Sequence, residues 1–200
     1  MSVAAGSKET ITEDLEARSL DIPEVKVFRA ERRGDRRGYV VPTYCKRGLA
    51  EAGVPFEIVH ENHCWSAKAA TVRGFHYQLP PYAQPKLIRV TRGRILDVSV
   101  DLRRGSPAFG RHTRIELDPA GWNQILVPTG FAHCYCTLTD DTEVIFKLGC
   151  EYAPKYARGL RWNDPDLGID WPVPEEDAIV LERDLDCPRF RELAEFFPYP

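Results

Sequence analysis

Apolar and polar residues alternate along the middle of this chain in a way that predicts β-structure. Between residues 73 and 147, short alternating runs are separated by turns such as Gly105-Ser106-Pro107 and Asp118-Pro119-Ala120-Gly121. A period of two residues places successive side chains on opposite faces of a strand. We therefore predict strands over residues 72–78, 87–90, 93–101, 112–117, 123–127, 133–138 and 142–147. Such spacing without intervening helices predicts an all-β jelly-roll, a β-sandwich or barrel with short peripheral helices.

Both ends of the chain depart from this pattern. Residues 1–22 are mostly polar and predict an N-terminal extension that is frayed or forms a short helix. Residues 23–200 are expected to form one jelly-roll domain, because 200 residues with 43% hydrophobic content suffice for one core. Outside the central region we predict strands over 25–28, 39–41 and 56–63, a short helix over 45–52 and an amphipathic helix over 188–197.

Composition narrows the possible partners. A net charge of -3 gives no reason to expect nucleic acid or an anionic membrane as a partner. No segment offers the ~20 consecutive apolar residues needed to span a bilayer. The first residues become charged too early for a secretory signal, and the 6 cysteines lack paired CxxC spacing. These features favour a cytoplasmic protein with reduced thiols.

The stretch 72–78 carries the first candidate chemistry. Arg73 and His76 have opposite parity, so an ideal strand cannot direct both side chains to the same face. A bulge, or the flexible Gly74 between them, would redirect one of the side chains. A histidine and an arginine gathered with Lys86 of the next strand make a poor core and a plausible active site.

Two patterns in these strands resemble the metal-binding motifs of cupins. His76 is followed by Gln78 and Lys86, and a Pro128-x-Gly130-x-x-His133 turn follows later. In a metal-binding cupin, a second histidine and a glutamate would stand at the positions of Gln78 and Lys86. An ammonium group repels divalent metals, so we expect a cupin-like cavity with no metal and no cofactor.

Residues 24–197 resemble the dTDP-4-dehydrorhamnose 3,5-epimerases and related nucleotide-sugar epimerases. The stretches that carry this resemblance, in order, are 73–78, 86–90, 97–107, 109–110, 128–133, 162–165 and 170–172. Individually each is weak, but their combination and order are highly specific. The resemblance implies a metal-independent jelly-roll homodimer that acts on a nucleoside-diphosphate 4-keto-6-deoxyhexose.

The chemistry of that substrate explains the residue types. A C4 ketone acidifies the hydrogens at C3 and C5, and inversion needs a base, a donor at the ketone oxygen and a returned proton. By resemblance, His76 is the base, Asp184 orients it, and Lys86 faces the keto oxygen.

The remaining site residues also come from the resemblance. His133 is expected near the keto oxygen, with Gln78 and Phe146 in the substrate site. Arg73 and Arg183 resemble diphosphate or sugar contacts, for which a guanidinium fork is suited. Arg37 matches an arginine that the family lends across the dimer, and Tyr152 matches an aromatic that stacks on the nucleoside base.

The chain departs from the family at three positions. Phe146 stands where the family has a tyrosine as catalytic acid, and Tyr135 stands where it usually has phenylalanine. Tyr135 shares strand parity with His133, so it either replaces the acid or is an ordinary core tyrosine. Pro42 replaces a glutamate beside the dimer-exchanged edge.

The leading hypothesis is an isomerase that epimerises C3, C5 or both in a dTDP-rhamnose type of pathway. The alternatives are a single-site epimerase, a 3,4-ketoisomerase on the same scaffold, and an inactive sugar-nucleotide-binding protein. A metal-dependent cupin dioxygenase is the least favoured, because Gln78 and Lys86 occupy ligand positions.

Overall fold

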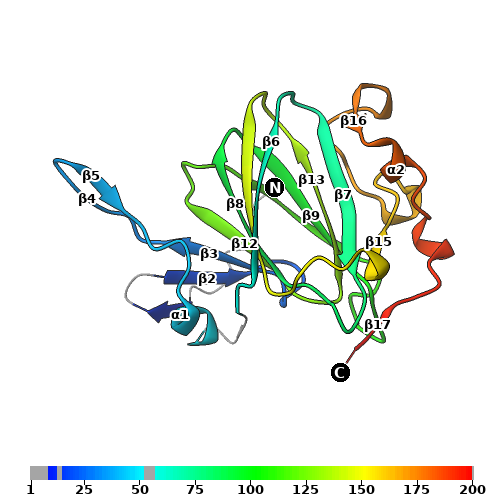
Figure 1. Cartoon of the computed structure of the whole chain (residues 1–200), viewed down its shortest axis with the longest axis horizontal. Coiled ribbons are helices and arrows are strands. Elements are labelled where there is room, and N and C mark those ends of the chain that lie inside the picture. Colours follow the sequence, from blue (N-terminus) through cyan, green and yellow to red (C-terminus); the bar gives the residue numbers. More distant parts are fainter. Residues whose placement is uncertain (1–8, 13–14, 52–56, 200) are drawn as a thin grey trace.

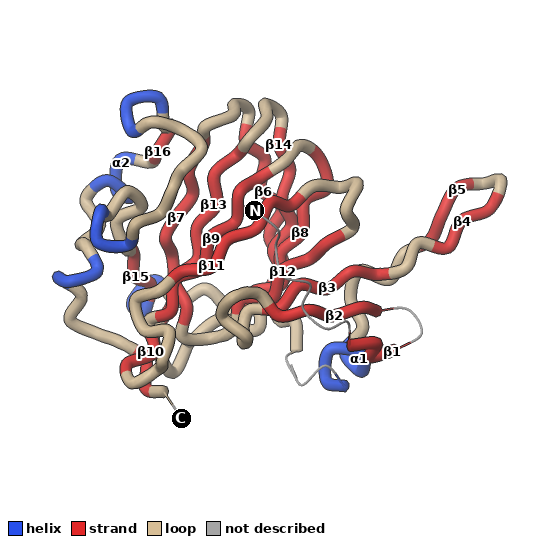
Figure 2. The backbone as a smooth tube through the Cα atoms, turned by 180° about the vertical axis from the view of Figure 1, so that it is seen from behind, coloured by secondary structure: helices blue, strands red, loops and turns tan. Residues whose placement is uncertain are grey.

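The computed structural model describes residues 9–12, 15–51 and 57–199. Most of these residues form two sheets that pack as a β-sandwich (Figures 1 and 2). The larger sheet contains, from edge to edge, β1 (Glu9–Thr12), β2 (Leu15–Ser19), β3 (Lys26–Ala30), β12 (Asn123–Val127), β8 (Lys86–Arg92), β14 (Thr142–Leu148) and β6 (His60–Ser66).

The smaller sheet contains the strands that lead into the C-terminal region. Its order is β11 (His112–Leu117), β9 (Ile95–Asp101), β13 (Phe131–Thr137), β7 (Thr71–Gln78) and β15 (Ala157–Gly159), with β16 (Ile179–Val180) pairing in parallel with β7. Two small pairs are β4 (Arg33–Asp35) with β5 (Gly38–Val40), and β10 (Arg103–Arg104) with β17 (Phe197–Pro198). The α-helices are α1 (Lys46–Glu51) and α2 (Glu182–Leu185), and no helix of the described residues is long and apolar enough to cross a membrane.

The all-β sandwich with short peripheral helices is confirmed, but the predictions for both ends of the chain are corrected. The segment expected to be frayed or helical contains the strand β2, which pairs with β3 and buries Ala17. The helix predicted over 188–197 is wrong, since only a 3₁₀ turn at Phe190–Glu192 and β17 form there. Residues 1–8 of the predicted extension and residues 52–56 of the predicted helix and strand lie outside the described residues.

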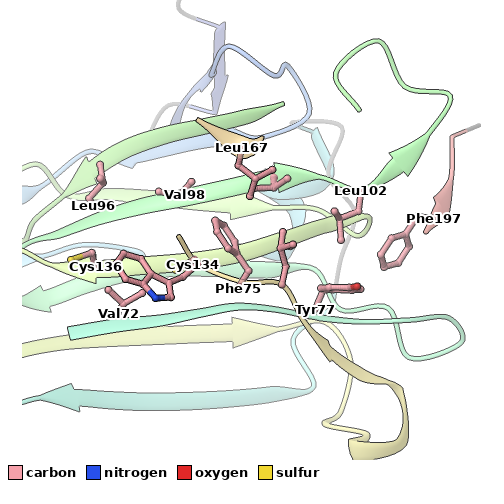
Figure 3. Packing of buried hydrophobic residues seen from close by; sticks show 14 of the residues in the cluster. Val72, Phe75, Tyr77, Leu96, Val98, Leu102, Cys134, Cys136, Leu167 and Phe197 are labelled. Atoms are coloured by element: carbon pink, nitrogen blue, oxygen red, sulfur yellow. The ribbon is translucent and has the colours of Figure 1, made fainter. Parts of the chain in front are cut away.

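The outer face of the smaller sheet carries a large apolar cluster (Figure 3). Phe75, Val98 and Cys134 are fully buried there. The segment after β15 covers this face and contributes Trp162 and Phe197. Burial of each large side chain stabilises the fold by roughly 1.5–3 kcal/mol, so this cluster holds the C-terminal region against β7, β9 and β13.

The inner face packs against the larger sheet and is only partly apolar. Ile88, Ile125 and Val144 of the larger sheet belong to the same cluster as Phe131 and Tyr135 of β13. The same face of the smaller sheet also buries Asp97, Ser99 and His133. Buried polar groups need partners or a ligand, so this part of the sandwich marks the candidate site.

Candidate active site

A cavity of about 550 Å³ opens on the inner face of the smaller sheet. Strands β6, β7, β8, β13 and β14 line it, and the segment from β16 to α2 closes one side. The predicted residues on this cavity are Arg73, His76, Lys86, His133, Tyr135, Phe146, Arg183 and Asp184. We call it the His76 cavity.

A bulge in β7 brings Arg73 and His76 to the same cavity. His133 of β13 pairs with His76, while Tyr135 pairs with Arg73, so β7 holds one extra residue. The bulge includes Gly74, whose φ of +117° suits glycine. A Cβ at this position would lie 2.5 Å from the His133 carbonyl oxygen. The bulge predicted from the opposite parity of the two side chains is confirmed.

His76 is held by the buried carboxylate of Asp184. The distance from His76 Nε2 to Asp184 Oδ1 is 2.9 Å, and the side chains are 41% and 5% exposed, respectively. Burial favours a higher pKa for Asp184, but the hydrogen bond and charge of His76, with the charge of Arg183, bring the pKa below its ordinary value. Asp184 is therefore ionised at neutral pH and can orient the imidazole.

Lys86 and His133 lie on opposite sheets, and the charge of Asp97 acts to raise the pKa of both side chains. Lys86 Nζ donates to the His76 carbonyl oxygen at 2.9 Å, and burial lowers the pKa of Lys86 to about 8 despite the nearby Asp97. His133 Nε2 lies 2.7 Å from Asp97 Oδ2, and burial lowers the pKa of His133, with Asp97 opposing. These groups form a buried polar cluster, in which the Lys86 ammonium would stabilise a new negative charge.

Two arginines border the cavity. Arg73 donates from Nε to Ser66 Oγ at 3.1 Å and from Nη2 to the Trp65 carbonyl oxygen at 3.0 Å, so its guanidinium is fixed. Arg183 is 70% exposed, with Nε 3.5 Å from Asp184 Oδ1. The rigid Arg73 suits a fixed ligand group, and Arg183 can reach outward.

Tyr135 and Phe146 pack together beside His133. Their ring centroids are 5.8 Å apart, and the His133 ring lies 6.4 Å from Tyr135 and 5.9 Å from Phe146. Within the described part of the chain, the buried Tyr135 hydroxyl has no well-aligned hydrogen-bond partner. Burial raises the pKa of Tyr135 above its ordinary value, and the charge of Arg73 opposes this effect.

Sequence reasoning missed Asp97, the partner of His133. Its signal was an acidic residue inside the otherwise apolar strand 93–101, at the parity that places it beside His133. Cys64 and Asn62 of β6 also line the cavity. No motif in the sequence pointed to these two residues.

Comparisons with known proteins show the family of this chain. The family model described as dTDP-4-dehydrorhamnose 3,5-epimerase covers residues 19–192. The dTDP-4-dehydrorhamnose 3,5-epimerase of Sinorhizobium fredii is 39% identical over 95% of this chain and 97% of its own. The chain belongs to the dTDP-4-dehydrorhamnose 3,5-epimerase family.

Solved structures of the same family share the fold. The Bacillus anthracis enzyme, determined with TDP and PPi bound, is 38% identical, with 88% of this chain and 99% of that chain covered and a TM-score of 0.84. The Legionella pneumophila dTDP-6-deoxy-D-glucose-3,5-epimerase, in complex with dTDP-4-keto-L-rhamnose, is 28% identical, with 93% and 99% covered and a TM-score of 0.87. The cupin-like fold predicted from the sequence is therefore the fold of this epimerase family.

A second cavity of about 370 Å³ adjoins the first and shares His76, Lys86 and Asp184 with it. Gln78 and the exposed Tyr152 line this second cavity, which we call the Tyr152 groove. Gln78 Nε2 donates to the carbonyl oxygens of residues 82 and 151, and its Oε1 accepts from the amide of residue 153. In this member of the epimerase family, Gln78 thus holds the loop that presents Tyr152.

Arg37 lies apart from both cavities. It belongs to the β4–β5 hairpin, which extends away from the sandwich (Figure 1), and its Nη2 lies 2.5 Å from Asp35 Oδ2. At the base of the hairpin, the Tyr39 ring packs edge-on against Trp122 at 5.1 Å. A single protomer of this epimerase-family chain therefore does not bring Arg37 to the His76 cavity.

The donor set of the His76 cavity does not resemble a metal site. Within residues 9–12, 15–51 and 57–199, no group of three His, Cys, Asp or Glu side chains is arranged to hold a metal ion. In this epimerase-family chain, the Lys86 ammonium on this cavity can donate to a ligand oxygen.

Proposed function

We propose that this chain is a 3,5-epimerase of a dTDP-4-keto-6-deoxyhexose in a rhamnose-type deoxysugar pathway. The observation that carries the proposal is the His76–Asp184 pair on a cavity shared with the buried Lys86. Family membership and the ligands of the Bacillus anthracis and Legionella pneumophila structures support the substrate class.

The base in this mechanism is His76. Asp184 holds Nε2, which leaves the other ring nitrogen to remove the proton from C3 or C5 beside the C4 ketone. Asp184 then stabilises the imidazolium that forms. Such a positioned base contributes typically ~10²–10⁴-fold to the rate. The reaction moves protons only, so it needs no redox cofactor.

Lys86 is proposed to face the ketone oxygen. As the proton leaves, the electron pair moves onto that oxygen, and a buried ammonium stabilises the enolate strongly. The lowered pKa of Lys86 also allows it to share a proton with the oxygen. His133, held by Asp97 through Nε2, lies beside Lys86 and completes the polar lining of this part of the cavity.

The two adjoining cavities suit a ligand with two parts. We assign the sugar to the His76 cavity and the nucleotide to the Tyr152 groove, since the two meet at His76. Tyr152 would stack on the base, and Arg73 and Arg183 would contact the diphosphate or sugar oxygens.

A homodimer is part of this proposal. The β4–β5 hairpin carries the exposed Arg37 away from its own sandwich, and Tyr39 and Val40 are 54% and 78% exposed (Figure 1). A second copy would cover these side chains and receive Arg37 at its site. Sedimentation velocity at micromolar concentration tests this assembly, and a monomer would contradict it.

Incubation with dTDP-4-keto-6-deoxyglucose in deuterated water tests the reaction. Deuterium at both C3 and C5 with inversion is the expected result. Inversion at one carbon would identify a single-site epimerase, which the phenyl ring of Phe146 on the cavity favours as the second candidate. Deuterium at C4 would indicate a ketoisomerase, and dTDP binding without exchange an inactive binding protein.

A further inference from the structure

The hydroxyl of Tyr135 is a buried polar group that does not contribute a well-formed hydrogen bond to the fold. Its side chain is 1% exposed and lines the His76 cavity, yet the hydroxyl has no well-aligned hydrogen-bond partner among the described residues. A buried hydroxyl without a partner costs free energy that folding alone does not recover. A ligand in the cavity would supply the missing partner.

The surroundings hold the phenol in place. The ring packs against Phe146 at 5.8 Å and near His133 at 6.4 Å, and β13 pairs Tyr135 with Arg73 of β7. Ser66 lies next to the phenol and lowers its pKa, but the contact lacks the geometry of a well-formed hydrogen bond, and Ser66 Oγ accepts one from Arg73 Nε at 3.1 Å. The hydroxyl is therefore positioned by packing, beside Arg73 and Ser66 at one end of the cavity that Tyr135 lines.

Other cavity groups are committed elsewhere. Thr71 carries the other hydroxyl among the described lining residues, and its Oγ1 donates to the Lys68 carbonyl oxygen at 2.8 Å. His133 Nε2 faces Asp97 at 2.7 Å. His76 is bound to Asp184. Tyr135 is thus the hydroxyl of this cavity that can still donate.

We propose that the Tyr135 hydroxyl is the catalytic acid that returns a proton to the sugar face opposite His76. The inference rests on the proposed epimerase function, which requires a base on one face and an acid on the other. His76 lies one cross-strand pair along from Tyr135 on the bulged β7–β13 ladder, so the two groups approach the cavity from different positions.

The proton transfers balance. His76 takes the proton from the C–H bond, and the electron pair delocalises onto the C4 oxygen as an enolate. The Tyr135 O–H bond then breaks, its proton forms the new C–H bond on the opposite face, and the enolate returns to the ketone. The phenolate regains a proton and the imidazolium loses one through solvent, so the cycle has no net change.

The electrostatic setting fits an acid of this kind. Burial raises the pKa of Tyr135, which keeps the hydroxyl protonated at neutral pH, and the Arg73 cation opposes that shift. The same cation would stabilise the phenolate that forms transiently.

The Tyr135→Phe variant separates the two half-reactions. We expect inversion to fall by ~10²–10⁴-fold, while deuterium still enters with retention at the carbon that His76 deprotonates. Binding of dTDP and the melting temperature should remain close to wild type. Tyr156→Phe is the matched control, because it removes a hydroxyl from a tyrosine that packs on Tyr82 outside the His76 cavity.

Two outcomes would overturn the inference. One is wild-type inversion by Tyr135→Phe; the other is an equal loss of exchange and inversion in a folded variant that binds dTDP. A wild-type protein without any exchange would instead refute the proposed function itself. If Tyr135→Phe does not fold, 3,5-difluorotyrosine at position 135 keeps the shape and lowers the phenol pKa. The alkaline limb of inversion should then move to lower pH, and an unmoved limb contradicts the role.

Discussion

The two faces of strand β13 are equally buried but carry different chemistry. Ala132, Cys134 and Cys136 point to the outer face and are 0% exposed within the apolar cluster. His133 and Tyr135 point to the inner face and are 3% and 1% exposed. The outer face serves stability, because its groups gain from leaving water. The inner face is buried at a cost, which indicates that its groups serve a ligand.

The same contrast extends to neighbouring strands. Phe75 and Val98 continue the outer cluster, while Asp97 and Lys86 place charged groups inside the sandwich. Substitutions on the two faces should therefore have opposite signatures. Inner-face changes should alter rate more than stability, and outer-face changes the reverse.

The largest effect is expected at His76. The variant His76→Asn removes the base, so inversion and deuterium exchange should fall by roughly 10³-fold or more. Because this side chain is 41% exposed, the melting temperature should stay near the wild-type value. NMR of dTDP-4-keto-6-deoxyglucose turnover measures the rate, and His63→Asn on the exposed edge strand β6 is the control. Exchange at the wild-type rate in His76→Asn would remove His76 from the mechanism.

The outer face should respond through stability. Leu102 is fully buried in the outer cluster, and Leu102→Ala should lower the free energy of unfolding by about 2–5 kcal/mol. Urea denaturation measures this loss, and the exposed Val59→Ala should cost less than about 0.5 kcal/mol. Below its melting temperature, Leu102→Ala should keep the wild-type KM. A large rise in KM at low temperature would show that the two faces are not separable.

Unlike most substitutions of a buried residue, Lys86→Met should increase the free energy of unfolding. Burial lowers its pKa from 10.5 to about 8, which corresponds to a cost of about 3 kcal/mol for the charged form at neutral pH. Lys86→Met removes this cost, while the lost bond to the His76 carbonyl oxygen offsets about 1 kcal/mol. The variant should therefore be more stable by about 2 kcal/mol and inactive.

The pH dependence provides the check on Lys86. Below about pH 8 the lysine is charged in both folded and unfolded protein, so the full cost is present. As pH rises from about 8 towards 10.5, only the unfolded state keeps the proton, so wild-type stability rises towards that of Lys86→Met. Activity should fall over the same range if the ammonium stabilises the enolate. If the free energies of unfolding of the two proteins changed in parallel with pH, the pKa of Lys86 would not be lowered in the folded state.

The smallest effect is expected at Arg37, which lies on neither face. Arg37→Ala should leave the melting temperature unchanged, because its ion pair with Asp35 is exposed. A several-fold rise in KM with little change in kcat would support its contribution to a partner's site. Arg36→Ala, next to it in the same hairpin turn, is the matched control, and equal kinetics for the two variants would remove Arg37 from the site.

Much of the fold could be predicted because its strands obey a simple period. The predicted strands over 112–117 and 123–127 coincide with β11 and β12. The bulge at Gly74 followed from the conflict between Arg73 and His76, which share a cavity despite their parity. Local pattern and turn chemistry sufficed wherever one face of a strand is apolar and the other is not.

The rest depended on contacts that a local pattern cannot show. The segment 188–197 has helical spacing, but its phenylalanines pack separately: Phe190 and Phe196 contact Phe109, while Phe197 joins the outer cluster beside β10. β2 forms because β3 offers a free edge. The role of Asp97 is visible only in the structure, where the pairing of β9 with β13 brings its carboxylate to His133. The roles of the site residues remain predictions that the variants above test.

The hydrogen bond between His76 and Asp184 joins positions separated by 108 residues. Asp184 reaches the cavity through α2, which follows the short parallel pairing of β16 with β7. A partly folded protein in which residues 179–185 have not yet settled against the sheet would therefore expose an imidazole without its carboxylate partner. Docking of this segment on β7 is thus the folding step that completes the pair, and protein truncated before α2 would lack it.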